Sequence, residues 1–208
     1  MAESPLTRYA VGLLAVLAVT GCGAGGSQDS SSFSAADANR IGSVRPQTPN
    51  WAWPKRTVSA GPCTPDDEPR EDPTDELQAT LDQELIEADL ICIAGSKWKD
   101  DDKLGALAAM RFESAAGAHK GLAAFRVFAH GWGERSGEVL GDEEIDGLGD
   151  ETTRLRVGGN GVQVTYFWRR GNLVLQAHIH CFGVCPPDVD ALTRVWVDAI
   201  DEEARTGG

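Results

Sequence analysis

Apolar side chains recur every three or four positions in three stretches of the chain, and each stretch follows residues that can cap a helix. Asp72 with Pro73, Ser114 and Asp188 supply these caps. The apolar positions after them form one stripe in each stretch: Leu77, Leu81, Leu85 and Ala88; Ala118, Leu122, Phe125, Phe128 and Ala129; Val189, Leu192, Val195, Trp196, Ala199 and Ile200. This spacing predicts helices over about residues 73–87, 114–130 and 188–206.

Five other stretches have the pattern of β-strands. Leu90–Ala94 and Leu104–Phe112 are short apolar runs, typical of buried strands, with a polar loop predicted between them at 95–103. Thr152–Val157, Val162–Arg169 and Asn172–Cys181 follow, separated by short turns that contain glycine. The spacing predicts consecutive hairpins.

The last hairpin also predicts which side chains face the core. Eight apolar side chains oppose one another on one face: Val162, Val164, Tyr166, Trp168, Leu173, Leu175, Ala177 and Ile179. The other face is expected to be largely wet, with Gln163, Thr165, Phe167, Val174, Gln176, His178 and His180. The order of elements predicts a single α+β domain over residues 63–205, an antiparallel sheet meander with about three helices packed on one face.

The N-terminal part has a different composition. Tyr9–Thr20 is an uncharged apolar run, shorter than the roughly 20 residues that span a bilayer, and it predicts a signal peptide over residues 1–21. Residues 22–62 are rich in Gly, Ser, Ala and Pro and predict a flexible tether. Trp51 and Trp53 interrupt the tether, either as an arm that covers an apolar patch or as a ligand-stacking pair.

Val19-Thr20-Gly21-Cys22 resembles the bacterial lipobox. The resemblance implies cleavage before Cys22, acylation of its thiol and anchoring to the extracytoplasmic face of the cell membrane. The alternative is an ordinary secretory signal with a chance cysteine.

Charge narrows the range of partners. The chain has 19 basic and 32 acidic residues, a net charge of −13, and no basic cluster with interleaved aromatic residues. Such a surface repels phosphate backbones, so we expect no nucleic-acid partner. The partners that remain are the membrane through Cys22, and an envelope protein or a small molecule.

Four further cysteines, Cys63, Cys92, Cys181 and Cys185, predict two disulfides in an exported protein. Closeness in sequence favours Cys63 with Cys92 and Cys181 with Cys185, whereas the inward direction of Cys181 would suit a bond to Cys92. The chain has no Cys-x-x-Cys motif, which argues against a thiol oxidoreductase.

His178 and His180 project from the same face of a strand, a spacing that could chelate Zn²⁺ or Cu²⁺ if Cys185, Gln163 or a carboxylate supplied a third ligand. Residues 142–147 resemble the opening of a calcium-binding EF-hand loop, but Thr153 stands where the final carboxylate belongs. The common signatures of catalysis and of cofactor binding are missing. We therefore expect no cofactor and assign no catalytic residue.

Ile145–Glu151, with its Gly-Leu-Gly-Asp-Glu run, and Arg169–Leu175, with its Arg-Arg-Gly-Asn turn, resemble small secreted lipoproteins of actinobacteria whose function is uncharacterised. The resemblance implies an extracytoplasmic domain and carries no functional residues. The sequence thus favours a non-enzymatic binding or sensing module of the cell envelope. The alternative is a metal carrier or metal-dependent envelope enzyme that uses His178 and His180.

Overall fold

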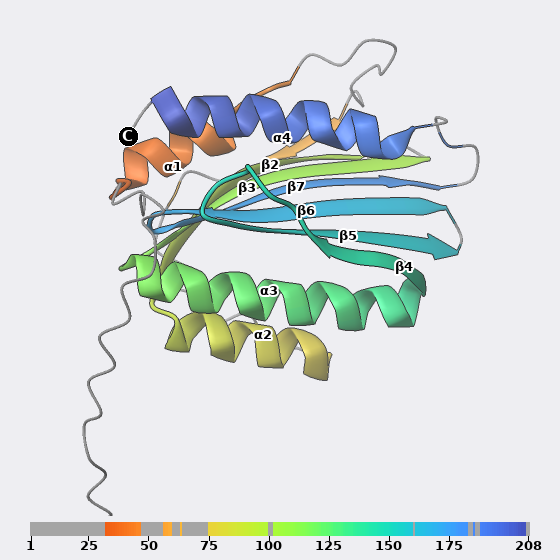
Figure 1. Cartoon of the computed structure of the whole chain (residues 1–208), viewed down its shortest axis with the longest axis horizontal. Coiled ribbons are helices and arrows are strands. Elements are labelled where there is room, and N and C mark those ends of the chain that lie inside the picture. The colour runs from red at the N-terminus through yellow and green to blue at the C-terminus, as the bar shows by residue number, and fades with distance from the viewer. Residues whose placement is uncertain are drawn as a thin grey trace, which may run out of the picture.

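The structure is a computed structural model that describes residues 32–46, 56–59, 63, 75–99, 102–159, 161–182, 185 and 188–206. The signal peptide, Cys22, Trp51 and Trp53 predicted from the sequence lie outside these residues. The helix predicted over 73–87 begins instead at Glu76, where the Asp75 side chain accepts from the backbone N–H of Leu77 and caps it in place of Asp72. The described part is an antiparallel sheet with helices above and below it (Figure 1).

Seven strands form the sheet in the order β1-β2-β3-β7-β6-β5-β4, and every neighbouring pair is antiparallel. Their bounds are β1 Arg56–Ser59, β2 Leu90–Lys99, β3 Lys103–Phe112, β4 Gly137–Glu144, β5 Glu151–Gly159, β6 Val162–Arg170 and β7 Leu173–Cys181. The antiparallel α+β class and the last two hairpins are confirmed. Part of the predicted loop at 95–103 belongs instead to β2, where it pairs with both β1 and β3.

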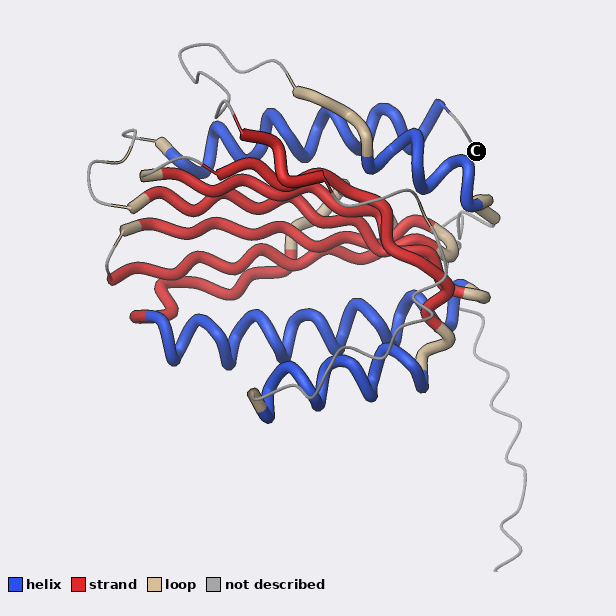
Figure 2. The backbone as a smooth tube through the Cα atoms, turned by 180° about the vertical axis from the view of Figure 1, so that it is seen from behind, coloured by secondary structure: helices blue, strands red, loops and turns tan. Residues whose placement is uncertain are grey.

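Helices cover both faces of the sheet, so the prediction that they pack on one face is wrong. Helix α1 (Ala35–Gly42) and helix α4 (Val189–Thr206) lie on one face, and α2 (Glu76–Glu87) and α3 (Ala115–Ser136) on the other (Figures 1 and 2). The face expected to be wet is covered by α3, whose Phe125 stacks on Phe167 at 5.6 Å. Gln163, Thr165 and Val174 on that face are buried as well.

The core is therefore split into two clusters, one on each side of the sheet. Seven of the eight side chains predicted to face the core are buried in the cluster under α1 and α4, and Val162 packs at its margin. Trp196 of α4 fills the centre of this cluster, where it meets Trp98 edge-to-face at 5.5 Å. A β-carbon on Gly105 would collide with the Trp196 ring, so the glycine lets α4 approach the sheet closely.

Part of the predicted tether is folded. Ser34 and Asp37 form a capping box at the start of α1, and Phe33 and Ile41 are buried in the core beneath α4. The backbone N–H and C=O of Phe33 both bond to the Asn172 side chain, at 2.7 and 3.2 Å. The chain thus joins the domain at Phe33, thirty residues before the predicted boundary at 63.

Two disulfides are formed, Cys63–Cys92 and Cys181–Cys185, with Cα–Cα distances of 5.1 and 5.5 Å. This is the local pairing that closeness in sequence favours. The first disulfide ties residue 63 to β2, and the backbone N–H of Cys63 also donates to Asn39 of α1. Cys63 is therefore fastened both to β2 and to α1.

A buried ion pair joins α4 to the end of β6. Asp201 is 2% exposed and receives both Arg170 Nε, at 2.6 Å, and Arg170 Nη2, at 3.0 Å. Trp168 Nε1 donates to the same carboxylate at 3.1 Å, and Arg205 approaches it at 2.7 Å. The Asp201 carboxylate thus has four donors in an environment that excludes water.

We predict that Asp201→Asn lowers the free energy of unfolding by about 3–5 kcal/mol, because the Arg170 guanidinium then stays buried without a counter-charge. Urea unfolding followed by tryptophan fluorescence measures this loss. Asp198→Asn, on an exposed carboxylate of the same helix, is the control and should change stability by less than about 0.5 kcal/mol. Equal unfolding midpoints for the two variants would contradict the assignment.

Candidate functional site

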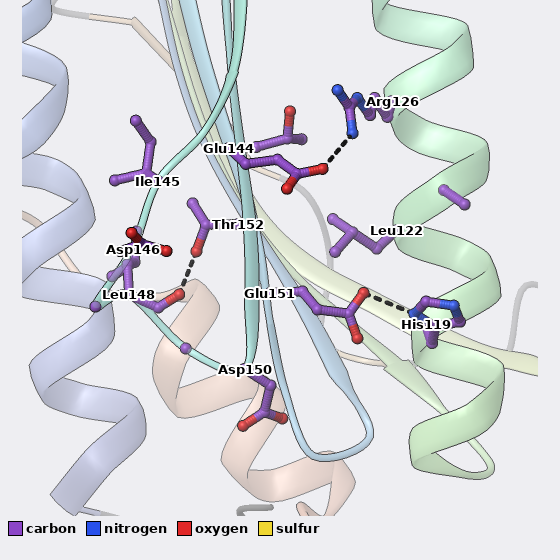
Figure 3. A pocket seen from close by; sticks show the side chains of 14 residues that line it. His119, Leu122, Arg126, Glu144, Ile145, Asp146, Leu148, Asp150, Glu151 and Thr152 are labelled. Carbon is purple, nitrogen blue, oxygen red and sulfur yellow. Dashed lines mark hydrogen bonds and ion pairs between the residues drawn. The ribbon is translucent and has the colours of Figure 1, made fainter. Parts of the chain in front are cut away.

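A pocket of about 390 Å³ lies between α3 and the loop that connects β4 to β5 (Figure 3). Fourteen residues line it: His119, Leu122, Ala123, Arg126, Glu144, Ile145, Asp146, Gly147, Leu148, Gly149, Asp150, Glu151, Thr152 and Thr153. Its volume is in the range of small-molecule sites. The loop contains the Gly-Leu-Gly-Asp-Glu run, so a motif that stood out in the sequence forms one wall of the pocket.

The other wall is one face of α3. Ser114 caps this helix by accepting a hydrogen bond from the backbone N–H of Gly117 at 3.0 Å. His119, Leu122, Ala123 and Arg126 then follow at helical spacing, so they project toward the same side. The helix runs to Ser136 rather than ending near His130 as predicted, because Gly133 fits against Val139 and Val157 of the sheet.

Two glycines shape the loop. Gly147 and Gly149 have φ angles of +81° and +64°, in the region that favours glycine. At Gly149 a β-carbon would also collide with the carbonyl oxygen of Arg169. Between them Leu148 is 2% exposed and packs in the core cluster under α4, while Thr152 donates its hydroxyl to the Leu148 carbonyl. The buried Leu148 side chain and the hydrogen bond of Thr152 thus anchor the loop to the core.

The loop is also bonded to the turn between β6 and β7. Asp150 accepts from the backbone N–H of Gly171 at 3.0 Å and from Arg169 Nη1 at 2.9 Å. Arg169 Nη2 lies 2.8 Å from Glu151 Oε1 as well. The two sequence motifs, Gly-Leu-Gly-Asp-Glu and Arg-Arg-Gly-Asn, are therefore halves of one contact, and the second holds the first in place.

A hydrogen bond and an ion pair bridge the two walls of the pocket. His119 Nδ1 lies 2.6 Å from Glu151 Oε2, and Arg126 Nη1 lies 3.1 Å from Glu144 Oε1 (Figure 3). Arg126 Nε also bonds to Asp142 Oδ2 at 3.2 Å. The hydrogen bond and charge of Asp142, with a smaller contribution from Glu144, raise the pKa of Arg126 above its usual value.

The polar side chains of the pocket lining are mostly carboxylates and hydroxyls that are already bonded. The lining includes no Ser, Cys or Lys. Its two hydroxyl groups are engaged as donors, Thr152 to the Leu148 carbonyl and Thr153 to Asp142 Oδ1 at 3.0 Å. The pocket lining therefore presents to His119 no thiol, no amine and no hydroxyl that is not already engaged as a donor, and the His119–Glu151 contact bridges the walls.

Three of the acidic residues that resemble the start of an EF-hand loop lie in the edge strand β4, and Asp146 lies in the loop that follows. Asp142, Glu143 and Glu144 lie in β4 and pair with β5. Asp142 bonds to Arg126 and Thr153, and Glu143 pairs with Arg154 at 2.7 Å. These carboxylates are arranged to bond arginines and a threonine.

His178 and His180 are partly exposed on the sheet face that carries α3, side by side as predicted, with ring centroids 6.4 Å apart. His178 Nδ1 hydrogen-bonds Thr165 Oγ1 at 2.8 Å, and the His180 ring packs on Phe182 at 3.9 Å. Cys185 is bonded to Cys181 and so is not a free thiolate ligand. In the part of the chain that is described, no three His, Cys, Asp or Glu side chains come together to hold a metal.

The surroundings of His178 keep it neutral. Burial is the main cause, and the nearby charges of His180 and Lys97 add to it; together they lower the pKa of His178 from 6.5 to about 3. Burial also lowers the pKa of His180. The pair therefore contributes an uncharged patch to the sheet face.

Comparisons with known proteins add little to this description. No family model matches the chain, and no curated protein matches it. Among solved structures, the extracellular domain of PknH from Mycobacterium tuberculosis is similar with a TM-score of 0.40 and 14% identity, over 82% of this chain and 93% of that one. A likeness of this size supports no inference about ligand or activity. Within the residues described, no helix combines the length and apolar character needed to cross a bilayer.

We predict that Asp150→Ala loosens the wall of the pocket. The variant removes two hydrogen bonds to the β6–β7 turn, which should cost about 1–3 kcal/mol. Hydrogen exchange read by mass spectrometry should show faster exchange in peptides that contain residues 145–151 and 171. Asp146→Ala, on an exposed carboxylate of the same loop, is the control and should leave exchange unchanged. Identical protection in both variants would count against the anchoring role of Asp150.

We also predict a dependence of stability on pH at His178. An unfolded chain protonates this histidine near pH 6.5, whereas the folded protein resists protonation until about pH 3. Its contribution to stability is therefore full above pH 6.5 and falls as pH drops toward 3. His178→Gln should flatten the fall in unfolding free energy over this range relative to the parent chain. His130→Gln, at a half-exposed histidine of α3, is the control, and equal slopes in both variants would refute the prediction.

Proposed function

We propose that the chain is a lipid-anchored, extracytoplasmic binding module, without catalytic activity, whose ligand site is the pocket between α3 and the β4–β5 loop. The observation that carries the proposal is the way the pocket is built. Its loop is held by the buried Leu148 and by the bonds of Asp150 to Arg169 and Gly171. A cavity with walls fixed in advance is what binding of a small molecule requires.

The two disulfides support the extracytoplasmic assignment. Such bonds form and persist in oxidising compartments outside the cytoplasm. The sequence supports the anchor, since Cys22 follows a short apolar run and small residues. Ten residues lie between Cys22 and Phe33, so the chain from one to the other spans at most about 40 Å, and acylation at Cys22 would hold the domain close to the membrane.

The anchor is tested on the protein extracted from membranes. Mass spectrometry of its N-terminal peptide should find Cys22 as the first residue, with acyl chains attached. Cys22→Ser should prevent acylation and release the domain from the membrane fraction. An intact Met1 in the native protein, or an unmodified residue 22, would rule the anchor out.

The pocket is tested by filling it. We predict that ligand-observed NMR with a small-molecule fragment set finds hits that bind the chain from residue 23, which keeps every contact described above. Ala123→Trp, which places an indole against the pocket, should abolish these hits. Ala191→Trp, at an exposed alanine of α4 on the other face of the sheet, should keep them. A set of hits unaffected by residue 123 would move the binding site elsewhere.

A further inference from the structure

The charges around the pocket are unbalanced. Five carboxylates stand on or beside its walls, and two guanidinium groups face them: Asp142, Glu144, Asp146, Asp150 and Glu151 against Arg126 and Arg169. Each arginine already contacts two of the carboxylates. The fixed side chains therefore leave an excess of negative charge, and the whole chain, at −13, reinforces it.

Two of the carboxylates are available to a ligand. Glu144 has a side chain 80% exposed and one ion pair, with Arg126. Asp146 is exposed on the loop, across the pocket from α3 (Figure 3), and makes no hydrogen bond or ion pair with the other residues described. The carboxylate oxygens of Asp146 face solvent, where a hydrogen-bond donor of a ligand can reach them.

The remaining lining decides what kind of cation fits. Leu122, Ala123 and Ile145 offer apolar contact beside the carboxylates. No Phe, Tyr or Trp lines the pocket, so it lacks the aromatic cage that quaternary ammonium groups favour. A carboxylate needs N–H donors on the cation to bond well, which ammonium and guanidinium groups supply.

An anionic ligand suits the pocket less well. Arg126 would be its natural partner, but this guanidinium is shared between Asp142 Oδ2 and Glu144 Oε1 at 3.2 and 3.1 Å. Arg169 is in turn bonded to Asp150 and Glu151. An incoming anion would have to displace one of these carboxylates and then remain close to it.

We propose that the pocket binds organic cations that carry a primary ammonium or guanidinium group on an apolar body, with Asp146 and Glu144 as the charged partners. This inference rests on the proposed function, because it names the ligand class of the same pocket. Ile145, Leu122 and Ala123 then contact the apolar body.

Four probes that share one body test the inference by calorimetry at pH 7 and low salt: 4-phenylbutylammonium, its N,N,N-trimethyl derivative, 4-phenylbutan-1-ol and 4-phenylbutanoate. The primary ammonium should bind most tightly, ahead of the trimethyl derivative and the alcohol, with the carboxylate weakest. Because the charges are exposed, the advantage of the ammonium over the alcohol should shrink at about 0.5 M salt.

Substitutions at the two carboxylates show which residues cause the preference for the ammonium. Asp146→Asn and Glu144→Gln should each weaken the primary ammonium by about two- to fivefold and leave the alcohol unchanged. Asp198→Asn, on an exposed carboxylate of α4, is the matched control and should change neither. Loss of the ammonium preference in Asp146→Asn alone would already support the assignment.

The possible failures are distinct. One outcome is that the alcohol or the carboxylate binds as tightly as the ammonium and that Ala123→Trp abolishes the binding of all these probes. The ligand class is then wrong, and the pocket remains a binding site. If none of the four binds while fragments that depend on residue 123 do, the cation assignment fails alone. If the binding of neither the probes nor any fragment depends on residue 123, both the cation assignment and the proposed function fail.

Discussion

The turn between β6 and β7 ties the sheet to α4, to the N-terminal segment and to the pocket loop, and the rest of the structure depends on it. Three side chains within four residues reach in three directions. Arg169 bonds to the pocket loop, Arg170 to Asp201 of α4, and Asn172 to the backbone of Phe33 and Phe112. Since β6 and β7 lie at the centre of the sheet, these contacts fix α4, the segment that leads into α1 and the pocket loop to the most buried strands.

The parts of the fold that could be predicted are those in which burial leaves a periodic pattern. The β6–β7 hairpin alternates cleanly, so its register and its inward side chains follow from the sequence. Helices α2, α3 and α4 have apolar stripes and cappable starts. By contrast, β4 is an edge strand with mostly polar side chains, and α1 is short and buries only Ile41 and two small residues. The pattern of polar and apolar residues in β4 and in α1 therefore does not differ from that of a loop.

The helices α2 and α3 cover a sheet face that the sequence of the β6–β7 hairpin assigned to solvent, and the structure gives the physical reason. Phe167 and Val174 are apolar residues on the face assigned to solvent, and they are the contact points for α3. The polar neighbours Gln163 and Thr165 are buried beside them, which hides the second core in the sequence. The pocket was missed for a related reason, because its walls come from segments that only the folded chain brings together. Glycines 147 and 149 were the one local signal of it.

The bond between Asn172 and Phe33 has a mechanical consequence. Phe33 is where the N-terminal chain enters the described domain, and the neighbouring residues Arg169 and Gly171 hold Asp150 of the pocket loop. Any pull transmitted along that chain is applied to the same turn that sets the shape of the pocket. The N-terminal chain and the pocket loop thus share one mechanical support within residues 169–172.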